Sequence, residues 1–270
     1  MTSLLLKVEG AGNDFLIGTG AWADRLSHDH GLVVGLCRRR RGIGADGVLA
    51  IRATARDRMS LVYHNADGSP AVFCGNGTRC AARAGVELLG LPGRLVVETG
   101  WTAVPAEVEG PVVRLELPAV EGPLRDVDIS VAGRRRRGWW LDVGVPHLVV
   151  PMDSVEELEV ELEAPELRRH ELFGTEGVNV NFTSLEDDGR LALRTYERGV
   201  ERETLCCGSG VVAAAAVHMR DGGPGSMTIR ARSGDELTVE APQGPHAGPV
   251  FLTGPTRFIA YIEPIDYPLS

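Results

Sequence analysis

Lysine is almost absent from this sequence: Lys7 is the only one among 270 residues, and it lies in an apolar segment that should form the opening strand. An enzyme that uses pyridoxal phosphate holds this cofactor through an active-site lysine. A single lysine within an apolar strand argues against that chemistry. The sequence therefore predicts a protein that works without pyridoxal phosphate, and we expect no other cofactor.

Paired metal-ligand and redox motifs are missing as well. The chain has five cysteines and seven histidines, and none of them forms a Cys-x-x-Cys or His-x-x-x-His spacing. Such spacings are typical of zinc sites and of dithiol redox proteins. We therefore expect no bound metal, and the cysteines form no paired framework that would predict structural disulfides.

Long apolar runs and an excess of positive charge are also lacking. No stretch approaches the roughly 20 apolar residues that span a bilayer, and Leu4-Leu5-Leu6 is too short for the core of a secretion signal. The formal net charge is −9, and the arginine runs Arg38–Arg41 and Arg134–Arg137 contain no aromatic residues. These features predict a cytoplasmic protein with a small-molecule substrate and without a nucleic-acid or membrane partner. A homodimer is left open.

One short motif occurs twice in the chain. Its copies are Cys74-Gly75-Asn76-Gly77 and Cys207-Gly208-Ser209-Gly210, and each precedes a run of small residues that includes Ala81-Ala82 or Ala213–Ala216. Such runs are typical of helices that pack too closely for large side chains. The pattern predicts two buried helices, each with a cysteine and two glycines at its N-terminus.

The repeat extends beyond the two motifs. Cys207 follows Cys74 by 133 residues, and the same offset relates Tyr63 to Tyr196 and Gly44 to Gly177. The two halves therefore resemble two versions of one ancestral unit. We expect the first half to comprise residues 1–117, with residues 256–270 crossing back to it, and the second half to comprise residues 118–255. Many short strands and one main helix in each half predict an α+β fold, with a sheet wrapped around a central helix.

Two further helices are expected, one in each half. Polar and apolar residues alternate at roughly helical spacing from about Trp22 to Arg39, and a second helix is expected near Val155 to Glu163.

The position of each cysteine suggests its chemistry. A helix N-terminus has free N–H groups and a positive dipole end, so it binds anions such as carboxylates and lowers the pKa of a thiol. Removing the α-hydrogen of an amino acid without a cofactor needs a strong base near the carbon and stabilisation of the developing charge. Inverting that carbon needs an acid on its opposite face. Cys74 and Cys207 would satisfy both needs as a thiolate and thiol pair, and the alternative is that both cysteines are simply structural.

Together, these segments resemble the diaminopimelate epimerase family. The resemblance runs from residue 7 to about residue 258, and the motifs keep the family's order. The segments that carry it are Gly12-Asn13-Asp14-Phe15, Gly42-Ile43-Gly44-Ala45-Asp46-Gly47, Asn65-Ala66-Asp67-Gly68-Ser69, Cys74-Gly75-Asn76-Gly77-Thr78-Arg79-Cys80, Asn179-Val180-Asn181-Phe182, Tyr196-Glu197-Arg198-Gly199 and Cys207-Gly208-Ser209-Gly210.

The resemblance implies two pseudo-symmetric domains, each an antiparallel sheet curled around a central helix. It implies an isomerase that interconverts LL- and meso-diaminopimelate in the biosynthesis of lysine and peptidoglycan precursors, with Cys74 and Cys207 as the catalytic acid/base residues. It also implies that Gly75, Asn76, Gly208 and Ser209 hold the reacting carboxylate. The other residues that it implies in substrate binding are Asn13, Asn65, Asn179, Glu197 and Arg198. It further implies that His147 and Glu197 order the active site.

Three other functions are compatible with parts of the sequence. A racemase of the same fold could act on proline, hydroxyproline or histidine, although Asn65, Asn179 and Arg198 favour a substrate with a second polar end. Val145 stands where many members of the family have an asparagine that contacts that end. A dithiol redox protein and a non-catalytic binding module are the remaining alternatives.

Overall fold

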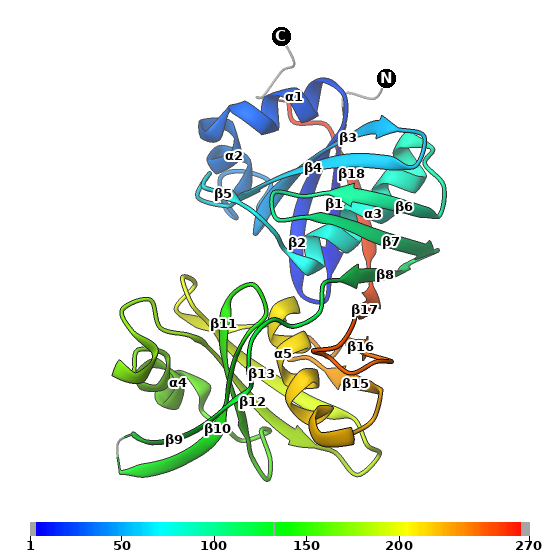
Figure 1. Ribbon diagram of the computed structural model, residues 1–270. Helices are drawn as coiled ribbons and strands as arrows, with labels where there is room; N and C mark the ends of the chain where they lie inside the picture. The colour runs from blue at the N-terminus through cyan, green and yellow to red at the C-terminus, as the bar shows by residue number, and fades with distance from the viewer. Residues whose placement is uncertain (1–3, 132, 266–270) are drawn as a thin grey trace. The chain divides into compact units, whose positions relative to one another are not determined.

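The computed structural model describes residues 4–131 and 133–265 and divides into two compact units (Figure 1). One unit contains the chain up to Glu116 and again from Gly254, and the other contains Leu117–Thr253. The last strand, β18 (Arg257–Ile262), pairs with the first strand, β1 (Leu5–Gly10), so this part of the segment 256–270 lies in the first unit. Residues 266–270 lie outside the described part of the chain.

The sheet of the first unit has the strand order β18-β1-β2-β3-β4-β6-β7-β8, and β5 pairs with the end of β4. Besides β1 and β18, its strands are β2 (Asn13–Gly18), β3 (Gly47–Ala55), β4 (Arg58–Asn65), β5 (Pro70–Ala71), β6 (Arg94–Glu98), β7 (Ala103–Glu109) and β8 (Val112–Leu117). Two pairings, β2 with β3 and β4 with β6, are parallel. Parallel neighbours need a crossover connection, and helices provide it in both cases.

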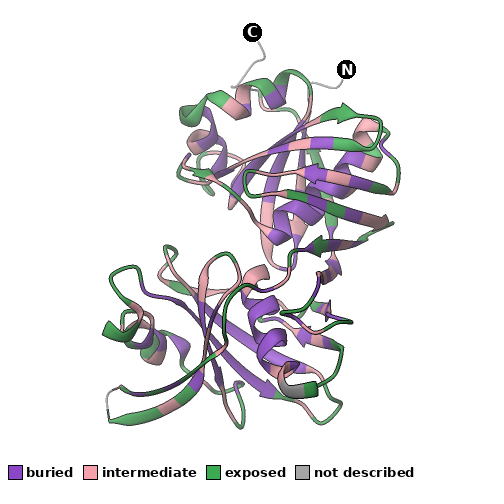
Figure 2. Ribbon diagram, in the orientation of Figure 1, coloured by how far each residue is buried: buried purple, intermediate pink, exposed green. Residues whose placement is uncertain are grey.

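Helix α3 (Gly75–Leu89) is the crossover between β4 and β6, and it contacts β1, β2, β3, β4, β6 and β7. The sheet therefore curls around α3, and Figure 2 shows most of this helix as buried. Small residues make the close packing possible. A Cβ atom on Gly85 would lie 2.6 Å from Met59 Sδ, and one on Gly77 would lie 3.3 Å from Leu49 Cδ2.

Residues Trp22–Arg39 form two short helices, α1 (Ala21–His28) and α2 (His30–Cys37), so the prediction of one continuous helix was wrong. Asp29 separates them. Its backbone N–H donates to Arg25 O at 2.8 Å, which ends α1, and its carboxylate accepts from Leu32 N at 2.9 Å, which caps the start of α2. Both helices cover the outer face of the sheet, where Leu16, Val48 and Ala50 join their apolar core.

The second unit repeats this arrangement with the strand order β9-β10-β11-β12-β13-β15-β16-β17, and β14 pairs with β13. Its strands are β9 (Arg125–Val131), β10 (Arg134–Asp142), β11 (Pro146–Pro151), β12 (Asn179–Leu185), β13 (Leu191–Glu197), β14 (Arg202–Thr204), β15 (Ser226–Arg230), β16 (Glu236–Glu240) and β17 (Val250–Pro255). Helix α5 (Gly208–His218) contacts six of them and is buried from Gly210 to Val217 (Figure 2).

Helix α4 (Val160–Arg168) packs against the other face of this sheet. It starts five residues later than the sequence suggested, at Val160 rather than Val155. The guanidinium of Arg194 explains the delay, because it donates to the carbonyl oxygens of Val155 at 2.9 Å and of Leu158 at 2.6 Å. The same carbonyls accept from the backbone N–H groups of Leu158 and Val160 in tight turns, not in the pattern of an α-helix.

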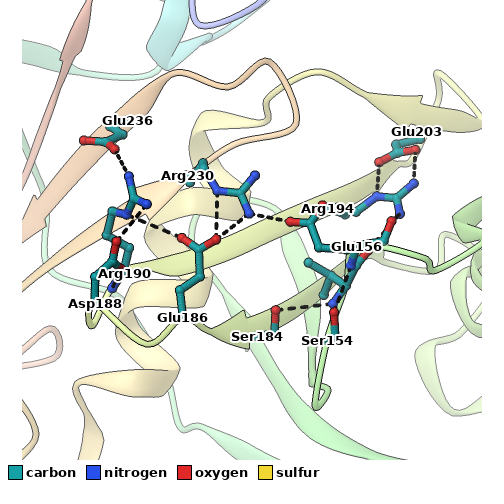
Figure 3. Close-up of polar contacts among 11 residues, drawn as sticks. Ser154, Glu156, Ser184, Glu186, Asp188, Arg190, Arg194, Glu203, Arg230 and Glu236 are labelled. Atoms are coloured by element: carbon teal, nitrogen blue, oxygen red, sulfur yellow. Dashed lines mark hydrogen bonds and ion pairs between the residues drawn. The ribbon is translucent and has the colours of Figure 1, made fainter.

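Arginines also connect the strands and loops at this side of the second unit (Figure 3). Arg194 on β13 donates hydrogen bonds to both carboxylate oxygens of Glu203 on β14, at 2.7 and 2.8 Å. Arg230 on β15 donates to Glu186 at 2.5 Å, and Arg190 lies next to the same carboxylate. None of these residues is among those that the sequence predicts in the active site.

The pairing registers confirm that the two units are repeats of each other. In the first unit Phe15 pairs with Gly47 and Arg58 with Val96. Adding 133 to each number gives the pairs Leu148 with Val180 and Leu191 with Ile229, and both occur in the second unit. The predicted α+β class, with a curled sheet around a central helix in each half, is confirmed, and two pairings in each unit are parallel.

Candidate active site

Cys74 is the N-cap of α3, as the sequence predicted. Its backbone is extended, with φ −149° and ψ 115°, and its Sγ accepts a hydrogen bond from Gly77 N at 3.4 Å. The side chain is half-buried. A helix leaves the N–H groups of its first turn without acceptors inside the helix, and here these groups belong to Gly75, Asn76 and Gly77. A sulfur and a set of N–H donors therefore lie together at this helix end.

Cys207 is the N-cap of α5 with nearly the same backbone conformation, φ −117° and ψ 113°. Its Sγ lies 3.3 Å from Ser209 Oγ. The sequence suggested that the helix N-terminus would lower the pKa of the thiol, and for Cys207 this was wrong. Burial raises the pKa of this thiol, and the negative charge of Glu197 raises it further, whereas the contacts with Ser209 and with the N–H of Gly210 lower it. The structure therefore holds Cys207 as a thiol at neutral pH.

Asn13 and Asn76, two predicted substrate-binding residues, are in direct contact. Asn76 Nδ2 donates to Asn13 Oδ1 at 2.8 Å, and Asn76 Oδ1 accepts from Arg79 at 2.8 Å. Arg79 and the Asn76 side chain are both buried, whereas Asn13 is half-buried. The contact joins the start of β2 to the first turn of α3, beside Cys74.

A charged cluster holds Asn13 from its other side. Asn13 Nδ2 donates to Asp46 at 3.1 Å, and Arg39 bridges Asp46 and Asp14 at 2.6 and 2.7 Å. The ammonium of Lys7 lies 2.5 Å from Asp14. Burial raises the pKa of Asp14, but hydrogen bonds from Arg39 and Lys7 outweigh it and hold this pKa below its usual value. The cluster therefore fixes the start of β2, which carries Asn13.

Asn65 lies at the end of β4 and is held by its own turn. Its Oδ1 accepts from the hydroxyl of Tyr63 at 2.9 Å, and its Nδ2 donates to Ser69 Oγ at 3.0 Å. Tyr63 and Cys74 line the same small cavity, of about 10 Å³. The structure thus links Asn65 to the surroundings of Cys74 through Tyr63.

In the second unit, Asn179 holds the backbone of Arg198. Asn179 Oδ1 accepts from Arg198 N at 2.8 Å, and its Nδ2 donates to Pro146 O at 3.4 Å. Asn179 is only 5% exposed, and its side chain forms these hydrogen bonds with the backbone. The Arg198 side chain is 27% exposed and lies 3.8 Å from the exposed Glu176. Glu197, the last residue of β13, is half-buried, and its charge raises the pKa of Cys207.

His147 is fully buried at the start of β11 and contacts the first turn of α5. Its Nε2 lies 3.0 Å from Ser209 Oγ, and its Nδ1 lies 2.9 Å from Asn181 Nδ2. Burial lowers the pKa of His147 to about 3, and the positive charge of Arg198 contributes in the same direction. The ring is therefore neutral at physiological pH, and Thr195 continues the network with a bond from its hydroxyl to Asn181 Oδ1 at 3.0 Å.

The predicted residues thus form one group in each unit. In the first unit they are Asn13, Asn65, Cys74, Gly75 and Asn76. In the second unit they are His147, Asn179, Glu197, Arg198, Cys207, Gly208 and Ser209. The sequence analysis assigned no role to Arg79, Asn181 and Thr195. Strand periodicity offered one signal, because Asn181 follows Asn179 by two residues and so lies on the same face of its strand.

The described residues contain no group of three or more His, Cys, Asp or Glu side chains that could hold a metal ion. Within residues 4–131 and 133–265, the helices are too short or too polar to cross a membrane.

Comparison with known proteins gives consistent results. The family model described as diaminopimelate epimerase matches residues 5–109 and 139–259. The diaminopimelate epimerase of Hydrogenobaculum sp. (strain Y04AAS1) is 34% identical over 269 residues, which cover 94% of this chain and 95% of that protein. The diaminopimelate epimerase of Chlorobaculum tepidum is 36% identical over 264 residues, covering 93% of this chain and 97% of that protein.

Solved structures share the fold at lower sequence identity. A hydroxyproline epimerase from Agrobacterium vitis superposes with a TM-score of 0.67 at 20% identity, and the match covers 96% of this chain and 90% of that one. At this identity the likeness extends to the fold alone.

Proposed function

Because the chain belongs to the diaminopimelate epimerase family, we propose that it interconverts LL- and meso-diaminopimelate, with Cys74 and Cys207 as the two acid/base groups. Family membership confirms the expected class of enzyme, an isomerase that acts as an epimerase. The proposed reaction serves the biosynthesis of lysine and of peptidoglycan precursors.

One observation carries the assignment of the two cysteines. Cys74 and Cys207 are the N-caps of α3 and α5, the two equivalent central helices of the repeat. Cys37 and Cys80 are buried in the first unit and are not repeated in the second, as is expected of structural cysteines. A structural role would not require a cysteine at the same position of both repeats. A pair of thiols from equivalent positions suits a reaction that needs one proton-transfer group on each face of a carbon.

The proposed chemistry is a proton exchange at the α-carbon. One sulfur, as a thiolate, takes the α-proton, and the electron pair of the broken C–H bond remains on the carbon and its carboxylate. The other sulfur, as a thiol, then delivers its proton to the opposite face. Atoms and charge balance, because one thiolate becomes a thiol and the other thiol becomes a thiolate. The raised pKa of Cys207 suits it to the role of proton donor in the resting enzyme.

The remaining predicted residues have roles that follow from their positions. The N–H groups of Gly75, Asn76, Gly208 and Ser209 stand at helix N-termini, which stabilise the negative charge of a carboxylate. Asn13 is positioned by Asn76 and Asp46. Arg198, with its backbone held by Asn179, suits the distal carboxylate of the substrate because its guanidinium can bind both oxygens.

The proposal includes catalysis without pyridoxal phosphate. The single lysine of the chain supports it, because Lys7 donates to Asp14 and to the carbonyl of Gly44 and is 12% exposed. An ammonium in an ion pair on a buried strand is poorly suited to form a Schiff base. Stabilisation of the carbanion would instead come from the helix N-termini.

Exchange of the α-hydrogen with solvent tests this function directly. The enzyme is incubated in D2O with LL-diaminopimelate, and mass spectrometry and chiral chromatography follow deuterium and the meso isomer. We expect deuterium to enter at an α-carbon as the meso isomer appears. The same assay with proline, hydroxyproline and histidine tests the rival substrates. Faster exchange with one of these, or none with any substrate, would overturn the proposal.

A further inference from the structure

A continuous chain of hydrogen-bonding side chains leads from the core of the second unit to Cys207. It comprises Thr195 on β13, Asn181 on β12, His147 on β11 and Ser209 on α5. The successive distances are 3.0 Å from Thr195 Oγ1 to Asn181 Oδ1, 2.9 Å from Asn181 Nδ2 to His147 Nδ1, 3.0 Å from His147 Nε2 to Ser209 Oγ, and 3.3 Å from Ser209 Oγ to Cys207 Sγ. Thr195, Asn181 and His147 are each at most 2% exposed.

The backbone carbonyl of Leu148 fixes the orientation of the Asn181 amide. The backbone carbonyl of Leu148 can only accept a hydrogen bond, and it lies 3.2 Å from Asn181 Nδ2. The amide oxygen must therefore point the other way, where the hydroxyl of Thr195 donates to it. Reversing the amide would bring two oxygens together at Leu148.

The amide orientation sets the tautomer of His147. Asn181 Nδ2 is a donor, so the Nδ1 atom that faces it carries a lone pair instead of a proton. The ring is neutral, because burial lowers its pKa to about 3. Its single proton is therefore on Nε2, which donates to Ser209 Oγ. Because Ser209 accepts this bond, its own hydroxyl proton is available for donation to Cys207 Sγ, which lies 3.3 Å away.

We propose that Asn181 and Thr195 are positioning residues that hold His147 as its Nε2–H tautomer, so that Ser209 donates a hydrogen bond to Cys207. The chain of bonds then has one direction, from the Thr195 hydroxyl to the sulfur. It stabilises the thiolate that Cys207 becomes after it has given up its proton. This inference rests on the acid/base role proposed for Cys207.

Comparison of the two halves shows that this network is not a consequence of the fold. Gly77 is the equivalent of Gly210 in the first half, and the side chains closest to it are Leu49 and Phe15 instead of Asn181 and Thr195. Neither Leu49 nor Phe15 can form such hydrogen bonds. The buried chain of polar side chains therefore belongs to the half that carries Cys207.

Gly210 shows how closely the network approaches the helix. A Cβ atom at this position would lie 2.4 Å from Asn181 Oδ1 and 3.2 Å from Thr195 Oγ1. The second glycine of the Cys-Gly-x-Gly motif thus makes room for the Asn181 amide next to Cys207.

The first test is spectroscopic and uses the wild-type protein. Labelling with ¹⁵N-histidine and assignment through His147→Gln identify which ring nitrogen of His147 carries the proton. We expect Nε2 to be protonated and Nδ1 to be unprotonated. Protonation at Nδ1 in the wild type would overturn the proposal without any need for a folded variant at Asn181.

The second test reverses the network with a substitution of equal size. In Asn181→Asp the carboxylate can only accept, so His147 should change to its Nδ1–H tautomer and Ser209 should donate to the ring instead of to Cys207. The rate of Cys207 alkylation by iodoacetamide, measured by peptide mapping, should fall by about tenfold, because the thiolate loses a charge-assisted bond. An unchanged tautomer or an unchanged rate would count against the inference.

The charge of the new aspartate could also act on Cys207 directly, and a double-mutant cycle separates the two effects. Ser209→Ala alone should slow alkylation about as much as Asn181→Asp alone. If the effect passes through Ser209, adding Asn181→Asp to Ser209→Ala should change the rate little further. Full additivity of the two substitutions would show that the field of the aspartate is responsible and would overturn the proposal.

Thr183→Val is the matched control. Thr183 lies on β12, two residues after Asn181, and its hydroxyl is 3.2 Å from Nε2 of His218 at the far end of α5. This variant also removes a buried bond between strand and helix, but it should leave Cys207 alkylation within about twofold of the wild-type rate. The failures are distinguishable: full epimerase activity in Cys207→Ala would refute the acid/base role, whereas the tautomer and the alkylation cycle report on the network itself.

Discussion

The imidazole Nε2 of His147 lies 3.0 Å from the hydroxyl oxygen of Ser209, although 62 residues separate them. This contact joins the start of β11 to the first turn of α5, beside Cys207. At the corresponding helix end of the first half, the side chains closest to Gly77 are Leu49 and Phe15. The repeat therefore presents two cysteines at the same place in two equivalent units but surrounds them with different side chains, so the two thiols are chemically distinct.

The first prediction concerns the five cysteines. Cys74→Ala and Cys207→Ala should each reduce epimerisation by about 10²–10⁴-fold, because one face of the substrate then lacks its proton donor or acceptor. The measurement is the initial rate of meso-diaminopimelate formation. Near wild-type turnover in either variant would refute the proposal of two bases.

The other three cysteines are the controls for this experiment. Cys37 is the last residue of α2 and Cys80 lies inside α3, so neither caps the N-terminus of a helix as Cys74 and Cys207 do. Cys37→Ala, Cys80→Ala and Cys206→Ala should stay within a few-fold of wild-type activity. If Cys206→Ala is the inactive variant, the assignment of Cys207 is displaced by one residue.

The repeated motif could be predicted from sequence because it depends on local rules. A cysteine and two glycines before a run of alanines specify a helix N-terminus and a close contact, and both are seen at α3 and α5. The 133-residue offset likewise predicted that the two halves repeat one unit, and the two units have the same order of strand pairings. These features depend on neighbours in sequence or on a comparison of the chain with itself.

The environment of each cysteine could not be predicted in the same way. The thiol pKa of Cys207 depends on its burial and on Glu197, which reach it only through the folded sheet. Asn181 and Thr195 lie on strands where a polar residue could equally face solvent, and only the structure shows that both face α5. The division of residues 22–39 into two helices also escaped the sequence analysis, because the side chain of Asp29 caps α2 within an otherwise helical pattern.

The second prediction compares two equivalent glycines, Gly77 and Gly210. A Cβ atom at Gly210 would lie 2.4 Å from Asn181 Oδ1, whereas one at Gly77 would come no closer than 3.3 Å to its nearest neighbour, Leu49 Cδ2. Gly210→Ala should therefore destabilise the protein by about 1–3 kcal/mol, as is usual for overpacking. Gly77→Ala should cost clearly less. Denaturant unfolding measures both, and equal losses would contradict the packing argument.

The third prediction follows from the pKa of His147. This pKa is about 3 in the folded protein, against 6.5 for an unperturbed histidine. As pH falls below about 6.5, the unfolded chain binds a proton that the folded chain does not, so stability decreases. The loss should approach about 1.4 kcal/mol per pH unit between these two values.

The comparison with His147→Gln isolates this effect. The free energy of unfolding is measured between pH 7 and pH 5 for both proteins, and the other histidines contribute equally to each. The variant should lose less stability across this range than the wild type. Parallel curves for the two proteins would mean that His147 becomes protonated without unfolding, contrary to its burial.

The last prediction tests the distal end of the substrate, at Arg198. If Arg198 binds the far carboxylate of diaminopimelate, Arg198→Ala should raise KM and lower kcat together, because remote contacts align the α-carbon with the sulfurs. The cost in kcat/KM should be roughly 2–5 kcal/mol. Arg198→Lys should recover little of it, since an ammonium cannot reproduce the planar fork of the guanidinium.

Arg169→Ala is the control. It also removes an arginine from an ion pair of the second unit, but from an exposed one with Glu201, and it should leave kcat/KM near the wild-type value. Lysine, which lacks the distal carboxylate, should be turned over barely or not at all by the wild type. Racemisation of proline or histidine that is faster than epimerisation of diaminopimelate would leave the two-thiol chemistry intact and transfer it to another substrate.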